Sequence, residues 1–136
     1  MSEKEVPYGF DEYTQLMKAV YFGNVVECTR LLSQDDIDLT KTVRNGFNIM
    51  HEVAFRNTKE TIFNIIIEKI KDKQQMNEII NKEASGNSTP LDFLYYRQLN
   101  GDTSPVLEKM INVLKQNGAK ANFYNINGEY EKKYKN

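Results

Sequence analysis

The chain of 136 residues has little of several residue types that mark particular folds and chemistries. Its one cysteine, Cys28, cannot form an internal disulfide, which favours a reducing compartment. No apolar run approaches the roughly 18 residues of a transmembrane helix, and the N-terminal "MSEKEVPYGF" is charged where a signal peptide is apolar. We therefore expect a cytoplasmic protein and no membrane partner. Delivery into a host cell stays open, since the sequence would not show it.

Charge of one sign is also lacking. The formal net charge is −1, so no overall field would attract the chain to nucleic acid or to an anionic membrane. There are 14 lysines but only 4 arginines, and arginine is the side chain that reads phosphate and guanine with two hydrogen bonds. The basic stretch "EKKYK" at 131–135 is too short to indicate nucleic-acid binding. We expect no nucleic-acid partner.

The residue patterns that hold cofactors and metals are missing as well. The glycines are scattered at turns and form no phosphate-binding loop. The acidic stretch "QDDID" at 34–38 lacks the glycine and final glutamate of a calcium-binding loop, so a solvated turn is expected there. One histidine and one cysteine cannot supply the three or four ligands of a zinc site. We expect no cofactor and no metal.

What the sequence does contain is helical periodicity in short pieces separated by polar turns. Asp11 is placed to cap a helix that runs to about residue 21, and "FGN" at 22–24 separates it from a second helix at about 25–32. A polar connection ending in Asn45-Gly46 follows, and this pair is typical of a tight turn. The pattern predicts an all-α fold.

The same order of elements recurs twice. "FNIMHEVAF" and "KETIFNIIIEKIK" predict two helices with a break near Arg56-Asn57, and an extra short helix is expected around residues 76–80. "STPLDFLYYRQL" predicts the next helix, with Ser88 or Thr89 as its cap and Pro90 in its first turn. "VLEKMINVLKQ" then predicts a last helix that ends at Asn117-Gly118.

Three helix–turn–helix units of this size resemble ankyrin repeats. The third unit carries "TPLD" at 89–92 and "NGAKAN" at 117–122, and the second carries "NIMHEVA" at 48–54. The first carries "TQLMKAV" at 14–20 and is recognised mainly by its register. The first-position residues of the motif (Thr14, Asn48 and Thr89) are 34 and 41 residues apart, whereas the family period is about 33. The longer spacing indicates insertions, mainly near 71–81.

The resemblance implies a short ankyrin-repeat solenoid at 11–123, in which each unit buries its apolar face against its neighbours. The repeats are expected at about 11–40, 41–81 and 82–123. Residues 1–10 would be an N-terminal extension, and 124–136 a tail or a partial fourth repeat.

The third unit departs from the family pattern at three positions. Asp92 stands in place of the family's histidine, and Leu94-Tyr95 stand in place of its paired alanines. Small residues there let neighbouring helices approach closely. Larger ones predict wider spacing, or an end unit with no neighbour on that side.

His51 is the one candidate for catalysis. A histidine base needs a substrate or nucleophile within reach and an orienting group, but Glu52 is its helical neighbour and points away from it. Cys28 is expected on an apolar helix face as a buried thiol. We therefore expect His51 to be structural, and the resemblance implies that it hydrogen-bonds the backbone of the turns.

The aromatic residues are better candidates for function. The resemblance places the two residues before each bend on a concave groove: Tyr21-Phe22, Phe55-Arg56 and Tyr96-Arg97. These residue types are enriched in the centres of protein interfaces. The turn tips would add Arg44, Asn45 and Phe47, together with Ser85 and Ser88. Burial in the core remains the alternative for Tyr21 and Phe55.

The resemblance thus implies a protein-binding module that uses the groove and turn tips, and not an enzyme. Two alternatives remain open. One is an inhibitory, immunity-type or host-directed effector protein that uses the same surface. The other, less favoured, is an enzyme or toxin. The partner would be another protein, and homodimerisation through the groove also stays open.

Overall fold

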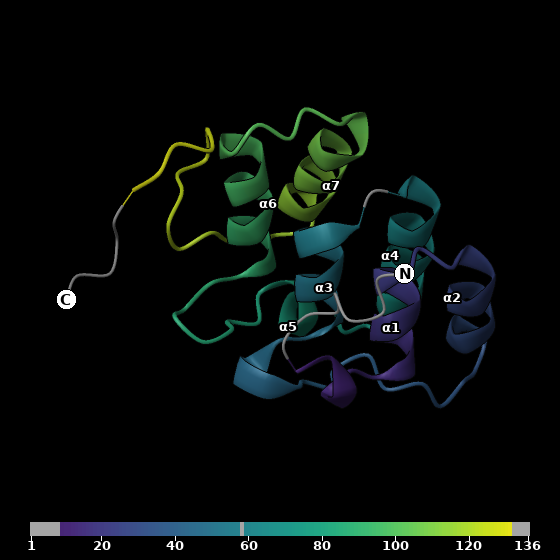
Figure 1. Ribbon diagram of the computed structural model, residues 1–136. Coiled ribbons are helices and arrows are strands. Elements are labelled where there is room, and N and C mark those ends of the chain that lie inside the picture. Colours follow the sequence, from purple (N-terminus) through teal and green to yellow (C-terminus); the bar gives the residue numbers. More distant parts are fainter. Residues whose placement is uncertain (1–8, 58, 132–136) are drawn as a thin grey trace.

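The computed structural model describes residues 9–57 and 59–131 (Figure 1). Within these residues the fold is all-α, with seven α-helices, two short 3-10 helices and no β-strand beyond isolated bridges. The helices are α1 (Gln15–Tyr21), α2 (Val25–Leu32), α3 (Ile49–Arg56), α4 (Glu60–Asp72), α5 (Met76–Ile80), α6 (Pro90–Leu99) and α7 (Pro105–Gln116), and the 3-10 helices are η1 (Phe10–Glu12) and η2 (Arg44–Gly46). The expected short helix near residue 76 is therefore present as α5.

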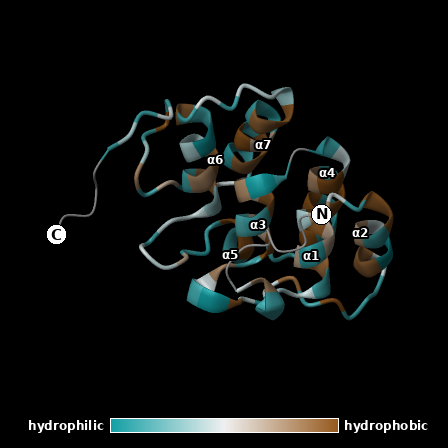
Figure 2. Ribbon diagram, viewed as in Figure 1, coloured by the Kyte–Doolittle hydropathy of each residue, from teal (hydrophilic) through white to brown (hydrophobic). Residues whose placement is uncertain are grey.

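The helices are arranged in two rows. In the first row α3 lies between α1 and α6 and contacts both (Figure 1). In the second row α2 packs on α1 and also against α4, while α7 packs on α6. Figure 2 shows the apolar residues gathered where helices face one another. The core runs without a break from Leu16 in the first pair to Tyr124 after the last.

The first helix of each pair starts at the equivalent position, because the residue before it caps it. Thr14, Asn48 and Thr89 each accept a hydrogen bond from the backbone N–H three residues on, at 3.0–3.2 Å. Asp11 was expected to cap α1, and that prediction is wrong. Asp11 lies inside η1, and the extended backbone at Tyr13 separates η1 from α1.

Tight hairpin turns precede α3 and α6. Each is closed by an isolated antiparallel bridge, Val43 with Phe47 and Ala84 with Ser88. Neighbouring turns are joined, since the N–H of Ser85 donates to the carbonyl oxygen of Asn45 at 2.7 Å. The left-handed backbone that such turns need is supplied in the first one by Asn45 and Gly46, with φ of 67° and 76°.

A third turn of this kind follows α7. Tyr124 bridges Tyr130, so residues 124–130 form a hairpin, and Tyr95 packs against Tyr124 with ring centroids 5.6 Å apart. The hairpin covers the side of the third unit where large residues replace the expected alanines, and Tyr95 is buried there. The third unit therefore has a neighbour on that side. Residues 1–8 and 132–136, which belong to the predicted extension and tail, lie outside the described residues.

Candidate protein-binding surface

Six aromatic rings follow one another across the three helix pairs. Their order is Phe22, Phe10, Tyr13, Phe47, Phe93 and Phe55, with successive ring centroids 5.8, 5.0, 6.1, 6.1 and 5.5 Å apart. Edge and offset contacts at these distances are favourable for aromatic rings. The chain of rings, called here the aromatic chain, connects the start of the structure with the third unit.

Several of the predicted groove residues are open to solvent. The side chain of Phe22 is 66% exposed, that of Tyr96 54% and that of Phe55 41%, whereas Tyr21 and Phe47 are half-buried. Isolated apolar residues at a surface are ordinary, but several in one neighbourhood often mark a contact site. The alternative that Phe55 belongs to the core does not fit its exposure.

Arg56 is held in place by its neighbours. Its guanidinium carbon lies 4.5 Å from the centroid of the Phe55 ring and 5.4 Å from that of Tyr21. Its Nε donates to Glu52 Oε2 at 2.9 Å, and its Nη2 donates to the hydroxyl oxygen of Tyr13 at 3.2 Å. Arg56 thus joins the second unit to the first.

Glu52 was not predicted as a notable residue, yet its side chain is fully buried. Burial raises its pKa to about 7, against the opposing effects of Arg56 and of the Tyr13 hydroxyl, which donates to Oε1 at 2.7 Å. The spacing of four residues between Glu52 and Arg56 is the one signal in the sequence that could have indicated this pair.

Arg97 was expected on the groove, and the structure corrects this. Its Nη1 donates to the backbone oxygens of Ala54 and Asn57 at 2.8 and 3.2 Å, and its Nη2 to Asp102 Oδ2 at 2.8 Å. The side chain is only 10% exposed. Its guanidinium satisfies the carbonyl groups at the end of α3, so it is not presented to a partner.

The tip residues are exposed, apart from the half-buried Phe47 and Ser88. Arg44 pairs with Glu12 at 2.5 Å, which lowers the pKa of that carboxyl. Asn45 is exposed at the turn. Of the third-unit tip, Ser85 is exposed and Ser88 half-buried.

His51 is fully buried and hydrogen-bonded at both ring nitrogens. Nδ1 accepts from the N–H of Asn48 at 3.0 Å, and Nε2 lies 3.2 Å from the carbonyl oxygen of Ser88 in the next hairpin. An accepting Nδ1 requires the neutral tautomer that carries its proton on Nε2. Burial lowers the pKa of His51 to about 4. The contact with Ser88 is the kind of turn contact that the sequence predicts.

Asp92, at the equivalent position of α6, makes the reverse contact. Its carboxylate accepts from the N–H groups of Asn122 and Phe123 at 2.8–3.0 Å, where His51 donates to a carbonyl oxygen. Asp92 therefore fastens the segment that leads into the C-terminal hairpin. An aspartate fits this position better than a histidine would, because the following segment presents backbone N–H groups, which need an acceptor.

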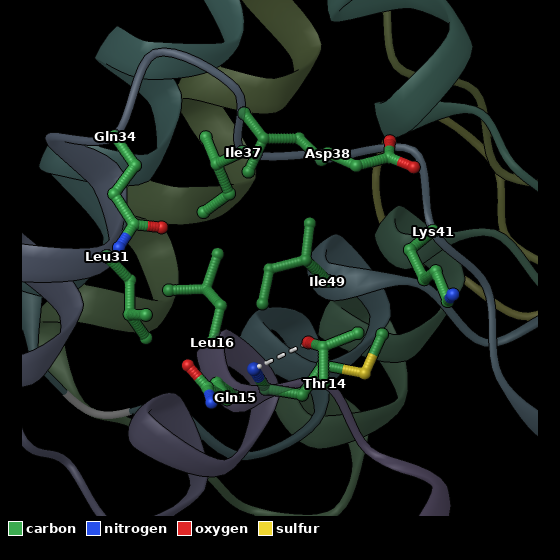
Figure 3. Close-up of a pocket in the computed structure, with 11 residues that line it drawn as sticks. Thr14, Gln15, Leu16, Leu31, Gln34, Ile37, Asp38, Lys41 and Ile49 are labelled. Atoms are coloured by element: carbon green, nitrogen blue, oxygen red, sulfur yellow. Dashed lines mark hydrogen bonds between the residues drawn. The ribbon is translucent and has the colours of Figure 1, made fainter.

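The remaining candidates from the sequence have structural surroundings. Cys28 is buried, which raises its pKa to about 11. Asp38, in the acidic stretch, accepts from the N–H and hydroxyl of Thr40. It lines a pocket of about 230 Å³ beside the start of α1, together with Leu16, Ile37 and other residues (Figure 3).

Within 9–57 and 59–131, no three or more histidine, cysteine, aspartate or glutamate side chains gather in a way that could hold a metal ion. No helix of that part of the chain is long and apolar enough to cross a membrane. Comparison with models of protein families, with curated proteins and with solved structures finds no match.

Proposed function

We propose that this chain is an ankyrin-type repeat protein that binds another protein and has no catalytic role. The ankyrin assignment is supported by three helix pairs whose first helices are capped at equivalent positions, and by hairpin turns that join neighbouring units. Units of this kind present a concave surface for binding.

The observation that carries the proposal is the position of the exposed rings. Phe22 and Phe55 belong to the aromatic chain, and Tyr96 lies on the same helix as its member Phe93. Aromatic side chains bury a large area at a small loss of conformational freedom, which makes them frequent anchors of interfaces. The partner would bury these three rings.

The proposal is tested on a purified partner. The immobilised chain captures candidate partners, each is purified, and its dissociation constant is measured by calorimetry for the wild type and for Phe55→Ala/Tyr96→Ala. Loss of two interface anchors at about 2 kcal/mol or more each is expected to weaken binding by at least about 700-fold. The matched control is Val26→Ala, an exposed apolar residue (79%) on α2.

Circular dichroism and the melting temperature show whether each variant is folded. A double variant that is folded and binds every purified partner as tightly as the wild type would rule out this surface. Equal weakening by Val26→Ala would point to α2 instead.

A further inference from the structure

An aromatic pocket of about 480 Å³ lies beside the C-terminal hairpin, within the size range of ligand pockets. Its lining consists of six aromatic residues, one serine and one aspartate: Phe55, Phe93, Tyr96, Phe123, Tyr124, Tyr130, Ser88 and Asp92. The faces of aromatic rings carry negative potential, which attracts cations. Rings from α3, α6 and the C-terminal segment meet here, so the pocket exists only because the hairpin is docked.

Asp92 adds a full negative charge to this lining. It is 3% exposed, and it is held by the N–H groups of Thr89, Asn122 and Phe123. Among the residues that the structure describes, no lysine, arginine or histidine forms an ion pair with it. Tyr124 has a raised pKa, first because it is buried and then because of the charge on Asp92. The charge of Asp92 thus acts on Tyr124, a residue that lines the pocket.

Aromatic rings and a buried carboxylate also occur together in the second unit, where they bind a guanidinium group. One unit earlier, aromatic rings and a buried carboxylate surround the guanidinium of Arg56, which lies over Tyr21 and Phe55 and bonds to Glu52. The residue equivalent to Arg56 in the third unit is Arg97, and its guanidinium is used at Asp102 and the end of α3. Within the described residues, the third unit therefore has aromatic rings and a buried carboxylate, that of Asp92 at the position of His51, but no cation paired with that carboxylate.

We infer that the aromatic pocket binds the guanidinium of an arginine side chain of the protein partner. This inference rests on the proposed function and names the partner's chemistry at one point of the surface. Guanidinium is planar and weakly hydrated, so it stacks on rings at a smaller desolvation cost than an ammonium group. Its charge would complement that of Asp92.

The experiment uses small probes and needs no identified partner. The full chain with ¹³C-labelled phenylalanine and tyrosine is titrated with N-acetyl-arginine methylamide and, separately, with the citrulline compound, which has the same shape and no charge. We expect saturable shifts of the Phe93 and Tyr96 signals with arginine, and binding of citrulline at least about tenfold weaker. Equal binding of the two probes, or no saturable shift with arginine, would overturn the inference.

Variants locate the binding. Tyr96→Ala is expected to weaken arginine binding about tenfold, whereas Leu99→Ala, an exposed apolar residue of the same helix outside the pocket, leaves it unchanged. Asp92→Asn removes the charge and keeps one acceptor, and should also weaken binding. If Asp92→Asn does not fold, the comparison of Tyr96→Ala with Leu99→Ala still decides.

Two outcomes separate this inference from its rivals. Lys132 and Lys133 follow the hairpin in the sequence. If replacing both with glutamine tightens arginine binding tenfold or more, the chain's own lysines compete for the pocket and the assignment to a partner is wrong. If the probe fails to bind but a purified partner still requires Phe55 and Tyr96, the arginine inference fails and the proposed function stands.

Discussion

The buried imidazole of His51 predicts a specific dependence of stability on pH. Its pKa is about 4 in the folded chain and 6.5 when unperturbed. Between these values the unfolded chain binds a proton at this ring that the folded chain does not. The stabilisation that comes from keeping His51 neutral is therefore fully present above pH 6.5. It is lost as the pH falls, until the folded ring also takes up a proton near pH 4.

The size of the effect follows from the two pKa values. The full difference is worth about 3 kcal/mol of unfolding free energy, and most of it is lost between pH 7.5 and pH 4.5. Other groups titrate in the same range, so the wild type alone does not isolate this contribution. His51→Gln removes the titrating ring and leaves an amide. Since no other histidine is present, the difference between the two proteins reports His51 alone.

The assay is urea unfolding of wild type and His51→Gln at pH 7.5 and pH 4.5. At pH 7.5 the variant should be less stable than the wild type, because the glutamine amide cannot fully replace the hydrogen bonds of the two ring nitrogens. Between pH 7.5 and pH 4.5 the wild type should lose about 2–3 kcal/mol more than the variant. The Hε1 resonance of His51, followed by NMR, should titrate near pH 4. A titration at pH 6 or above, or equal losses in the two proteins, would refute the reasoning.

Three further predictions concern stability and are measured by urea or thermal unfolding. The pKa of Glu52 is raised to about 7, so between pH 4.5 and 7 the folded chain binds a proton that the unfolded chain does not, and stability falls as the pH rises through that window. Glu52→Gln should abolish this fall, which is worth about 3 kcal/mol. An unchanged dependence of stability on pH in the variant would contradict the prediction. Arg97→Met should cost about 2–4 kcal/mol because it leaves buried carbonyl groups unpaired, whereas the exposed control Arg30→Met should cost less than about 1 kcal/mol. Gly46→Ala should lower the free energy of unfolding more than Gly86→Ala. Both glycines have positive φ, but only at Gly46 would the new Cβ lie 3.2 Å from a backbone oxygen. Equal losses of stability in the two variants would show that φ alone matters.

The parts of the fold that could be predicted from the sequence are those decided by neighbouring residues. Helix periodicity, the cap at Thr89 and the stop at Asn117-Gly118 depend on contacts within four residues, and the structure has them where expected. The prediction that Asp11 caps α1 failed because a residue of a capping type caps a helix only where the chain continues directly into that helix. Tyr13 is extended, so the helix begins only after Thr14.

The parts that could not be predicted depend on contacts between distant residues. The burial of Glu52 requires Tyr13, which lies 39 residues earlier. The partners of Arg97 at the end of α3 are 40 and 43 residues away. Residues 124–136 were expected as a tail or a partial fourth repeat, and the docking of the hairpin at 124–130 over Tyr95 depends on a contact with a residue about 30 positions earlier. The composition of these segments is ordinary, and only the packing of the units brings the groups together.

In the pairs Phe55-Arg56 and Tyr96-Arg97, the arginine and the aromatic residue have different roles, and these roles are the same in both pairs. In each pair the arginine reaches back to the preceding unit, since Arg56 lies over Tyr21 and Arg97 bonds to the carbonyl oxygen of Ala54. The aromatic member is in both cases the exposed one, Phe55 and Tyr96. A substitution of either arginine would therefore lower stability and weaken binding through unfolding, whereas substitution of the rings removes exposed surface. Binding has to be tested at the rings, and coupling between units at the arginines.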